Sequence, residues 1–180
     1  MTVSKDINII KEKLLIKGVI ALNIYVIAVG KIKEKFFRDA VEEYKKRLSR
    51  YCKLEIIEVP DEKTPDNASE KEEEMIKEKE GQKILKHISD KMFVITLEID
   101  AKQPSSEELA AKIKELSIKG ESNIAFVIGG SLGLAKSVQQ RANHKMSFSR
   151  LTFPHQLFRV MVLEQIYRGY RIISGEPYHK

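Results

Sequence analysis

The chain has 180 residues, 42% of them hydrophobic, which suits one domain that buries about 70% of its unfolded surface. Its only cysteine, Cys52, excludes an intramolecular disulfide and makes a reducing cytoplasm the expected compartment. The net charge is +6, no apolar run has the length of a membrane span, and Lys11 to Lys13 interrupt what would be the centre of a secretion signal, so we expect neither membrane insertion nor secretion.

Short apolar runs rich in β-branched residues alternate with helical patterns along the chain. The runs predict strands at 23–29, 53–59, 92–97, 123–128 and 145–149. Between and after them, the helical patterns predict helices at about 37–51, 70–88, 106–120, 134–143 and 154–173. This order predicts an α/β fold, with a mainly parallel sheet flanked by helices.

Three helix starts have recognisable capping residues. Ser69 precedes an acidic first turn, and Ser105 forms a capping box with Glu108. Thr152 is a candidate cap for the last helix, with Pro154 in its first turn.

The last predicted helix has apolar residues on nearly every side, yet it also contains Arg159, Arg168 and Arg171. A helix that is apolar all round is buried or lies between subunits. Two interpretations stay open. Either it is a core helix whose arginines reach solvent, or the arginines face an anion across a subunit boundary.

Charge is unevenly distributed. The segment 31–53 contains nine Lys and Arg against four Asp and Glu, and 136–180 contains eight against two. The acids concentrate in 61–80. This asymmetry favours a polyanion that contacts one face, and the alternative is a set of solvated helix faces.

In parallel sheets, ligands bind beyond the carboxyl ends of the strands. Those ends carry Gly30, Leu97, the glycine turn 129–133 and Ser149-Arg150. The glycines let a ligand approach the backbone closely, but their spacing fits neither a dinucleotide fingerprint nor a phosphate loop. Ser131 does not stand in a hydrolase elbow.

The four histidines, at 87, 144, 155 and 179, lack metal-ligand spacing, so no metal is expected. The C-terminal tail 175–180 is either a loose end or part of a site. Tyr178 is suited to stacking on a base, while His179 and Lys180 are suited to phosphate contact or proton transfer.

Several motifs together resemble one known family. They are Ala28-Val29-Gly30-Lys31, Phe126 to Ser131 with Gly133, Ser147-x-Ser149, Thr152 to Gln156, Glu164-Gln165-x-Tyr167-Arg168 and Pro177 to Lys180. In this combination the chain closely resembles the RlmH family of the SPOUT superfamily, the pseudouridine N3-methyltransferases of large-subunit ribosomal RNA. The resemblance covers residues 22–180 as a single domain. Residues 1–21 lie outside it, and we expect them to come from an over-long gene start, with Leu22 as the true UUG start codon.

The resemblance implies a C-terminal trefoil knot at about 124–180, S-adenosylmethionine as cofactor, and a homodimer whose active site spans both chains. Carried over by position, the cofactor-binding residues are Leu97, Gly129, Gly130, Phe148, Ser149, Arg150, Leu151, Thr152 and Phe153. As a hypothesis, Arg168 stabilises negative charge on the base, while Tyr178 and His179 position the base or relay a proton.

The implied reaction is methylation of N3 of a pseudouridine in 23S rRNA of the assembled ribosome. With no added RNA-binding domain, the dimer surface itself would recognise the RNA, using residues such as Lys31, Lys33, Arg150 and Arg171. Two alternatives remain: a SPOUT methyltransferase that acts on another RNA such as tRNA, and a non-catalytic ribosome-binding factor.

Overall fold

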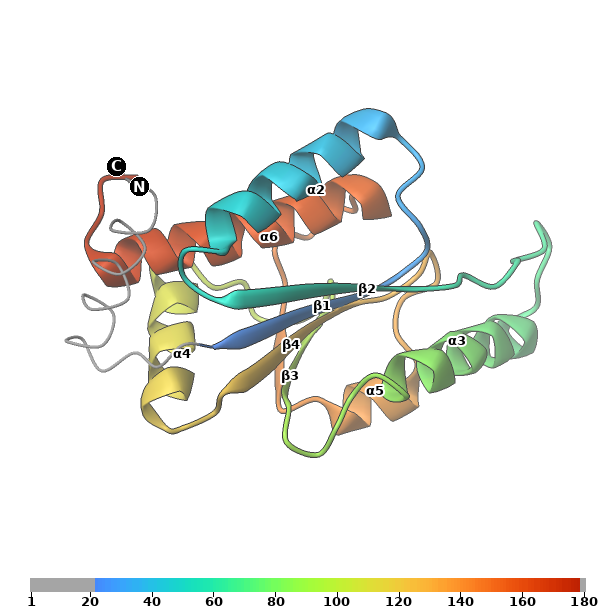
Figure 1. Cartoon of the computed structure of the whole chain (residues 1–180). Coiled ribbons are helices and arrows are strands. Elements are labelled where there is room, and N and C mark those ends of the chain that lie inside the picture. Colours follow the sequence, from blue (N-terminus) through green and yellow to red (C-terminus); the bar gives the residue numbers. More distant parts are fainter. Residues whose placement is uncertain (1–21, 179–180) are drawn as a thin grey trace.

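The computed structural model describes residues 22–178, which form a five-stranded, wholly parallel sheet between two layers of helices (Figure 1). The strand order is β2-β1-β4-β3-β5. The strands are β1 (Asn23–Val29), β2 (Lys53–Val59), β3 (Phe93–Leu97), β4 (Asn123–Ile128) and β5 (His144–Met146). The helices are α2 (Lys35–Leu48), α3 (Glu70–Leu85), α4 (Ser106–Ile118), α5 (Lys136–Arg141) and α6 (His155–Ser174).

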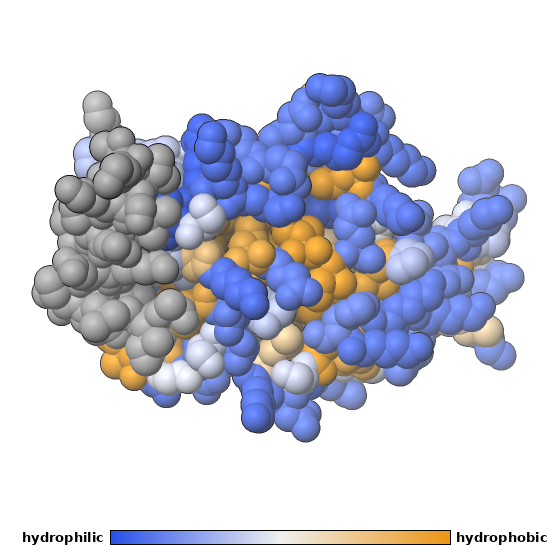
Figure 2. Space-filling model, viewed as in Figure 1, coloured by the Kyte–Doolittle hydropathy of each residue, from blue (hydrophilic) through white to orange (hydrophobic). Residues whose placement is uncertain are grey.

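Each face of the sheet has its own core. On β4, Ile124 and Phe126 join α2, α4 and α6 in one apolar cluster, whereas Ala125 and Val127 join α3 and α5 in the other. Because β4 is covered on both faces, its whole run is apolar, as is usual for a buried parallel strand. Figure 2 shows apolar surface in a band between two hydrophilic helical layers, over the edge strand β2. The predicted α/β class is confirmed, and the knot stays a prediction.

The predicted cap at Ser69 and the predicted capping box at Ser105 are both present, and Ser69 also forms a capping box with Glu72. The prediction for the last helix was wrong in detail, because Pro154 itself is the N-cap and makes no side-chain capping bond, so Thr152 is not the cap. Strand β5 also ends earlier than predicted. The N–H of Ser147 donates to the Lys102 carbonyl (2.9 Å) instead of continuing the ladder with β3.

Helix α6 lies between α2 and α4 against the sheet, and this position accounts for most of its apolar character. Val162, Leu163 and Ile166 are fully buried within the chain. The interpretation that its arginines reach solvent was wrong for Arg159, which is 1% exposed. Val160 and Met161 are only partly covered, so the predicted dimer contact stays a prediction.

Several expectations concern parts outside the described residues, namely the extension 1–21 and the tail positions His179 and Lys180. Within residues 22–178, no helix has the length and hydropathy needed to cross a membrane. The same residues contain no group of three or more His, Cys, Asp or Glu side chains placed to hold a metal ion.

Candidate functional site

A cavity of about 760 Å³ opens at the carboxyl edge of the sheet, where the parallel topology brings the ends of β3 and β4 together. Eight of the nine predicted cofactor-binding residues line it: Leu97, Gly129, Gly130, Phe148, Ser149, Leu151, Thr152 and Phe153. The exception is Arg150, which is exposed and is not among the lining residues. Topology therefore assembles one site from three loops that are distant in the sequence.

The glycine turn forms one wall of the cavity. It is closed by a hydrogen bond from the Gly133 N–H to the Gly130 carbonyl (3.1 Å), and Gly133 has a φ of +87°. A Cβ added to Gly129 would lie 2.8 Å from the Gly133 carbonyl group. The sequence-based interpretation attributed these glycines to close approach of a ligand, but packing within the turn already requires Gly129.

Behind the glycine turn lies Glu80 of α3, which sequence reasoning missed. Its carboxylate accepts the Glu62 N–H (2.9 Å), and a Cβ on Gly130 would lie 2.6 Å from Glu80 Oε2. Glu80 is 5% exposed, and this burial raises the pKa of its carboxyl group. Glu80 thus holds the loop after β2 through Glu62 and lies close behind Gly130, where a larger residue would not fit. Because Glu80 is one of many acidic residues in this helix, nothing in the local sequence indicated its role.

The loop after β5 forms the opposite wall. Ser147 Oγ donates to the Ser149 carbonyl (3.0 Å), and Ser149 Oγ accepts the Leu151 N–H (2.9 Å). These local bonds hold Phe148 and Phe153 against Phe158 of α6, with ring centroids 5.2 and 6.2 Å away. The result is an aromatic wall beside a turn with exposed backbone groups, a combination suited to a flat heteroaromatic ligand.

Polar groups at the cavity include Glu98 and His155. Glu98 accepts hydrogen bonds from Thr96 Oγ1 (2.7 Å) and Gln139 Nε2 (3.3 Å), which fix its carboxylate at the end of β3. Burial, followed by the nearby charge of Arg159, lowers the pKa of His155, so its imidazole is neutral at pH 7. In the sequence, Glu98 is marked by its position directly after a strand and His155 by its place in the motif Thr152 to Gln156.

The predicted catalytic residues Arg168 and Tyr178 both form hydrogen bonds with Glu164. Arg168 Nε and Nη2 donate to Glu164 Oε1 at 2.9 and 2.7 Å, and the Tyr178 hydroxyl donates to the same oxygen at 3.3 Å. The Arg168 guanidinium stands 4.8 Å from the centre of the Tyr178 ring. Glu164 was not predicted as a site residue, although its spacing of four from Arg168 is typical of helical ion pairs.

The tail through Tyr178 packs back on α6. Arg171 pairs with Glu176 (2.7 Å) and donates to the Pro177 carbonyl (3.2 Å). Tyr44 of α2 lies beside Tyr178, and burial, with the nearby Tyr178 and Glu164, raises the pKa of Tyr44 to about 12. Its phenol therefore stays protonated at neutral pH.

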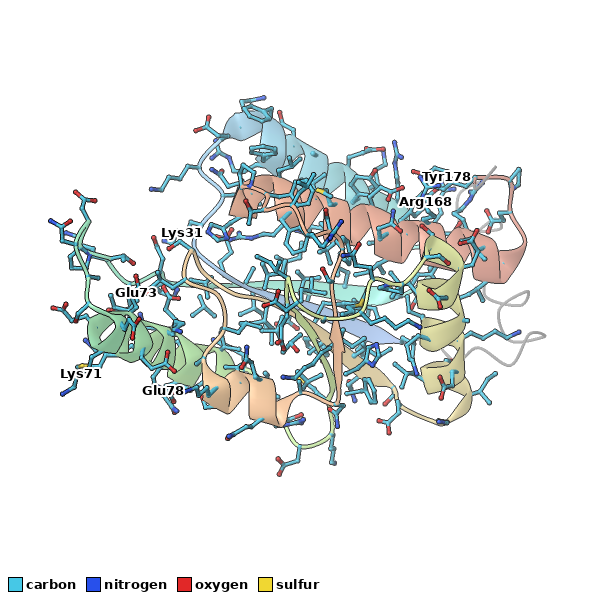
Figure 3. The ribbon with its side chains drawn as sticks, turned by 180° about the vertical axis from the view of Figure 1, so that it is seen from behind. Lys31, Lys71, Glu73, Glu78, Arg168 and Tyr178 are labelled. Atoms are coloured by element: carbon cyan, nitrogen blue, oxygen red, sulfur yellow. The ribbon has the colours of Figure 1, made fainter. Side chains whose placement is uncertain are left out.

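The cavity and this cluster are separate within one chain. Phe158 lines the cavity, and Arg168 follows ten residues later on the same helix, about 15 Å further along its axis. Figure 3 shows Arg168 and Tyr178 side by side at the C-terminal end of α6, away from Lys31 at the other side of the molecule. The structure does not bring the predicted catalytic and cofactor-binding residues together in a single chain.

Comparison with known proteins identifies the family of this chain. Residues 22–179 match the family model described as predicted SPOUT methyltransferase. The chain is 69% identical over 159 residues to "Ribosomal RNA large subunit methyltransferase H" of Clostridium beijerinckii, and 67% identical to the protein of the same name from Clostridium tetani. A third relative with this name, from Clostridium kluyveri, is 60% identical. Each match covers 88% of this chain and 100% of the relative. The chain belongs to the SPOUT methyltransferase family.

Proposed function

We propose that this methyltransferase uses S-adenosylmethionine to methylate N3 of a pseudouridine in 23S rRNA of the assembled ribosome. The observation that carries the proposal is the match of 60–69% identity over the full length of relatives named for large-subunit ribosomal RNA methylation. The cavity adds physical support, because its size and lining suit a nucleoside-containing cofactor.

Residues around the cavity fit the cofactor. Phe148 and Phe153 of the aromatic wall would contact an adenine, and the backbone groups of the glycine turn and of the loop 149–153 would orient the cofactor. The bound cofactor supplies an electrophilic methyl group on a sulfonium. Since methyl transfer needs in-line placement of the nucleophile, the walls contribute mainly by orientation and by excluding water.

The acceptor nitrogen must lose a proton, because N3 of a uracil-type base belongs to an imide. Arg168 stabilises the negative charge that develops on the base, while Tyr178 and His179 position the base or relay the proton. Glu164 holds the Arg168 guanidinium and the Tyr178 hydroxyl in one place. Residues held by such contacts need little reorganisation when the base arrives.

Because Arg168 follows Phe158 of its own cavity by about 15 Å along α6, we assign the active site to two chains, with the cavity of one subunit facing Arg168 of the other. Complementation tests this arrangement. A Gly129→Val chain with a blocked cavity, mixed with an Arg168→Ala chain, forms heterodimers with one intact site each. Random mixing then restores about a quarter of wild-type activity in a two-fold dimer. A site contained in one chain would give no recovery.

The function itself is tested by methyl transfer from labelled S-adenosylmethionine to purified ribosomes that lack the modification. Free ribosomal RNA and tRNA serve as competing substrates, and mass spectrometry maps the label. We expect label at N3 of a large-subunit pseudouridine, from assembled ribosomes. Label on tRNA would identify a different substrate, and failure to bind the cofactor would favour a non-catalytic ribosome-binding factor.

A further inference from the structure

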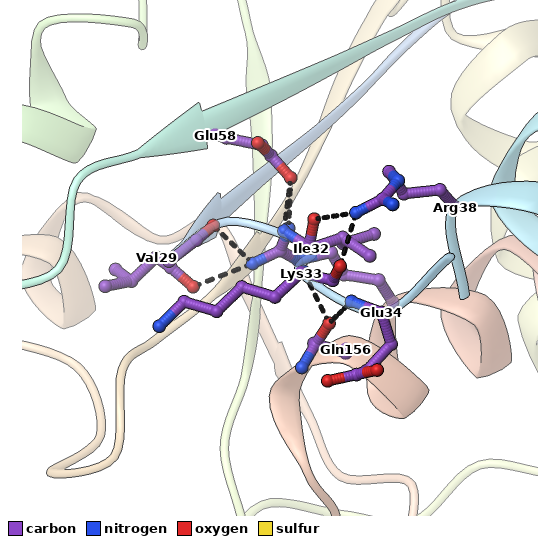
Figure 4. A network of polar contacts seen from close by, with 9 residues as sticks. Val29, Ile32, Lys33, Glu34, Arg38, Glu58 and Gln156 are labelled. Carbon is purple, nitrogen blue, oxygen red and sulfur yellow. Dashed lines mark hydrogen bonds and ion pairs between the residues drawn. The ribbon is translucent and has the colours of Figure 1, made fainter. Parts of the chain in front are cut away.

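The loop between β1 and α2 is held by an unusual number of side chains. The Ile32 N–H donates to Glu58 Oε1 (3.0 Å), while the N–H groups of Lys33 and Glu34 both donate to Gln156 Oε1 (2.7 and 3.0 Å). Arg38 Nη1 donates to the carbonyls of Ile32 and Lys33. Figure 4 shows Glu58 and Gln156 reaching this loop from different elements. The loop backbone is thereby fixed from both sides.

Arg159 secures the start of the same loop from below. Its guanidinium donates to the carbonyls of Val29 (2.9 Å) and Gly30 (2.6 Å) and pairs with Glu58 Oε1 (2.7 Å). Although most loops are mobile, this one has little freedom left in its backbone. Side chains that it presents to solvent therefore meet a partner with a smaller loss of entropy.

The solvent-facing side chains of the loop are cationic and aromatic. Lys31, Lys33 and Lys35 are exposed, and Phe36 at the start of α2 is 62% exposed, with its ring centroid 4.2 Å from that of Phe37. Among the described residues, neither Lys31 nor Lys33 takes part in an ion pair, whereas Lys35 pairs with Asp39 (2.8 Å). The loop thus presents two exposed ammonium groups, and an exposed aromatic ring follows at the start of α2.

The adjoining helix α2 continues the excess of positive charge. Segment 31–53 has an excess of five positive charges, and on α2 the acids Asp39, Glu42 and Glu43 are each neutralised by a neighbouring Lys or Arg. Glu58 is likewise paired with Arg159. Glu34 is the remaining acid of the segment. A long basic face with one exposed aromatic ring is typical of surfaces that bind unpaired nucleic acid.

This loop also lies next to the cavity. Gln156, which holds the loop, follows directly on Pro154 and His155, which line the cavity. In Figure 1 the N-terminal ends of α2 and α6 lie side by side, at the carboxyl edge of the sheet. A polynucleotide that brings its target base to the opening of the cofactor cavity therefore has its neighbouring nucleotides near the loop.

We propose that the loop 31–36 is a preformed RNA clamp, in which Phe36 stacks on an unpaired base flanking the target and Lys31 and Lys33 contact its phosphates. This inference rests on the proposed function, and it adds where the ribosomal RNA is held. Recognition by stacking and phosphate contact requires a single-stranded or looped target, because the bases of a duplex present no free face.

The test uses the full chain and purified ribosomes that lack the modification. Phe36→Ala should weaken ribosome binding about 5- to 160-fold, the range that the loss of one base stack gives, while cofactor affinity is unchanged. Phe36→Trp should restore binding. The double variant Lys31→Ala/Lys33→Ala should reduce the slope of log K against log salt by about 1.4, for two single-strand phosphate contacts.

Matched controls come from the same chain. Ile118, at the end of α4, is 60% exposed and serves as the exposed apolar control for Phe36. Lys86 and Lys91 are exposed between α3 and β3 and match the two loop lysines. Ile118→Ala and Lys86→Ala/Lys91→Ala should leave ribosome binding at the wild-type level.

Three outcomes overturn the clamp. If the loop variants bind ribosomes as tightly as the control variants, and the wild-type chain methylates ribosomal RNA, the clamp is refuted. A change of oligomeric state in Phe36→Ala, measured by sedimentation, would instead identify the surface as a contact between chains. If the wild-type chain methylates no ribosomal RNA, the proposed function is refuted, and the clamp that rests on it is refuted as well.

Discussion

Replacing Arg159 with Met should destabilise the fold strongly, because this side chain is the most deeply buried charge in the described part of the chain. The substitution keeps the aliphatic stem but leaves the carbonyls of Val29 and Gly30 without their donor. Each unsatisfied buried acceptor costs about 1–3 kcal/mol. Glu58 is 34% exposed and regains water, so it adds little. We expect a loss of about 4 kcal/mol, within the range of roughly 3–5 for a broken buried pair.

Urea unfolding at one fixed protomer concentration measures this loss, because an association of chains would make stability depend on concentration. With an m-value of about 2 kcal/mol/M, the midpoint should fall by about 2 M. The matched control is Arg38→Met, an exposed arginine that donates to carbonyls of the same loop, with an expected change of about 0.5 kcal/mol. A loss for Arg159→Met as small as that of the control would refute the reasoning.

Three further outcomes concern the site. Gly129→Ala should weaken S-adenosylmethionine binding in calorimetry, since its Cβ would lie 2.8 Å from the Gly133 carbonyl group and force the turn to move. Arg168→Ala, and deletion of the last three residues from Tyr178, should lower turnover about 10²- to 10³-fold while cofactor affinity stays nearly intact; equal loss of both would contradict their catalytic assignment. The pKa of Glu80 is raised by burial, so its contribution to stability is fully present below its unfolded pKa and is lost as the pH rises through the folded value. The free energy of unfolding of Glu80→Gln, measured from pH 4 to 8, should not show this decline. A difference in unfolding free energy from wild type that does not vary with pH would contradict the prediction.

Three of the strands could be predicted residue by residue. Strands β1, β2 and β4 begin and end where the apolar runs do, because Gly30, Pro60 and Gly129 follow them directly. Strand β5 could not, since it spans only three residues and its end is set by the bond from Ser147 to Lys102, a partner far away in the sequence.

The cavity was predictable for a different reason. A parallel sheet places the ends of its strands at one edge, so residues after β3, β4 and β5 had to meet there. The supporting carboxylates were not predictable, because Glu80 and Glu164 act through contacts made only in the folded chain. The burial of Arg159 likewise depends on carbonyls at the end of β1, 130 residues earlier.

Helix α6 determines how the parts of the site relate to one another. Its first turns carry Phe158 at the cavity and Arg159 beneath the basic loop, and its later turns carry Glu164 and Arg168. On this helix Arg168 follows Phe158 by ten residues, or about 15 Å along the axis. In the proposed two-chain site, a second chain supplies the catalytic cluster to the cofactor cavity. In that arrangement the cavity of one subunit holds the cofactor and its loop 31–36 holds the RNA, while Arg168 and Tyr178 of the other subunit reach the target base.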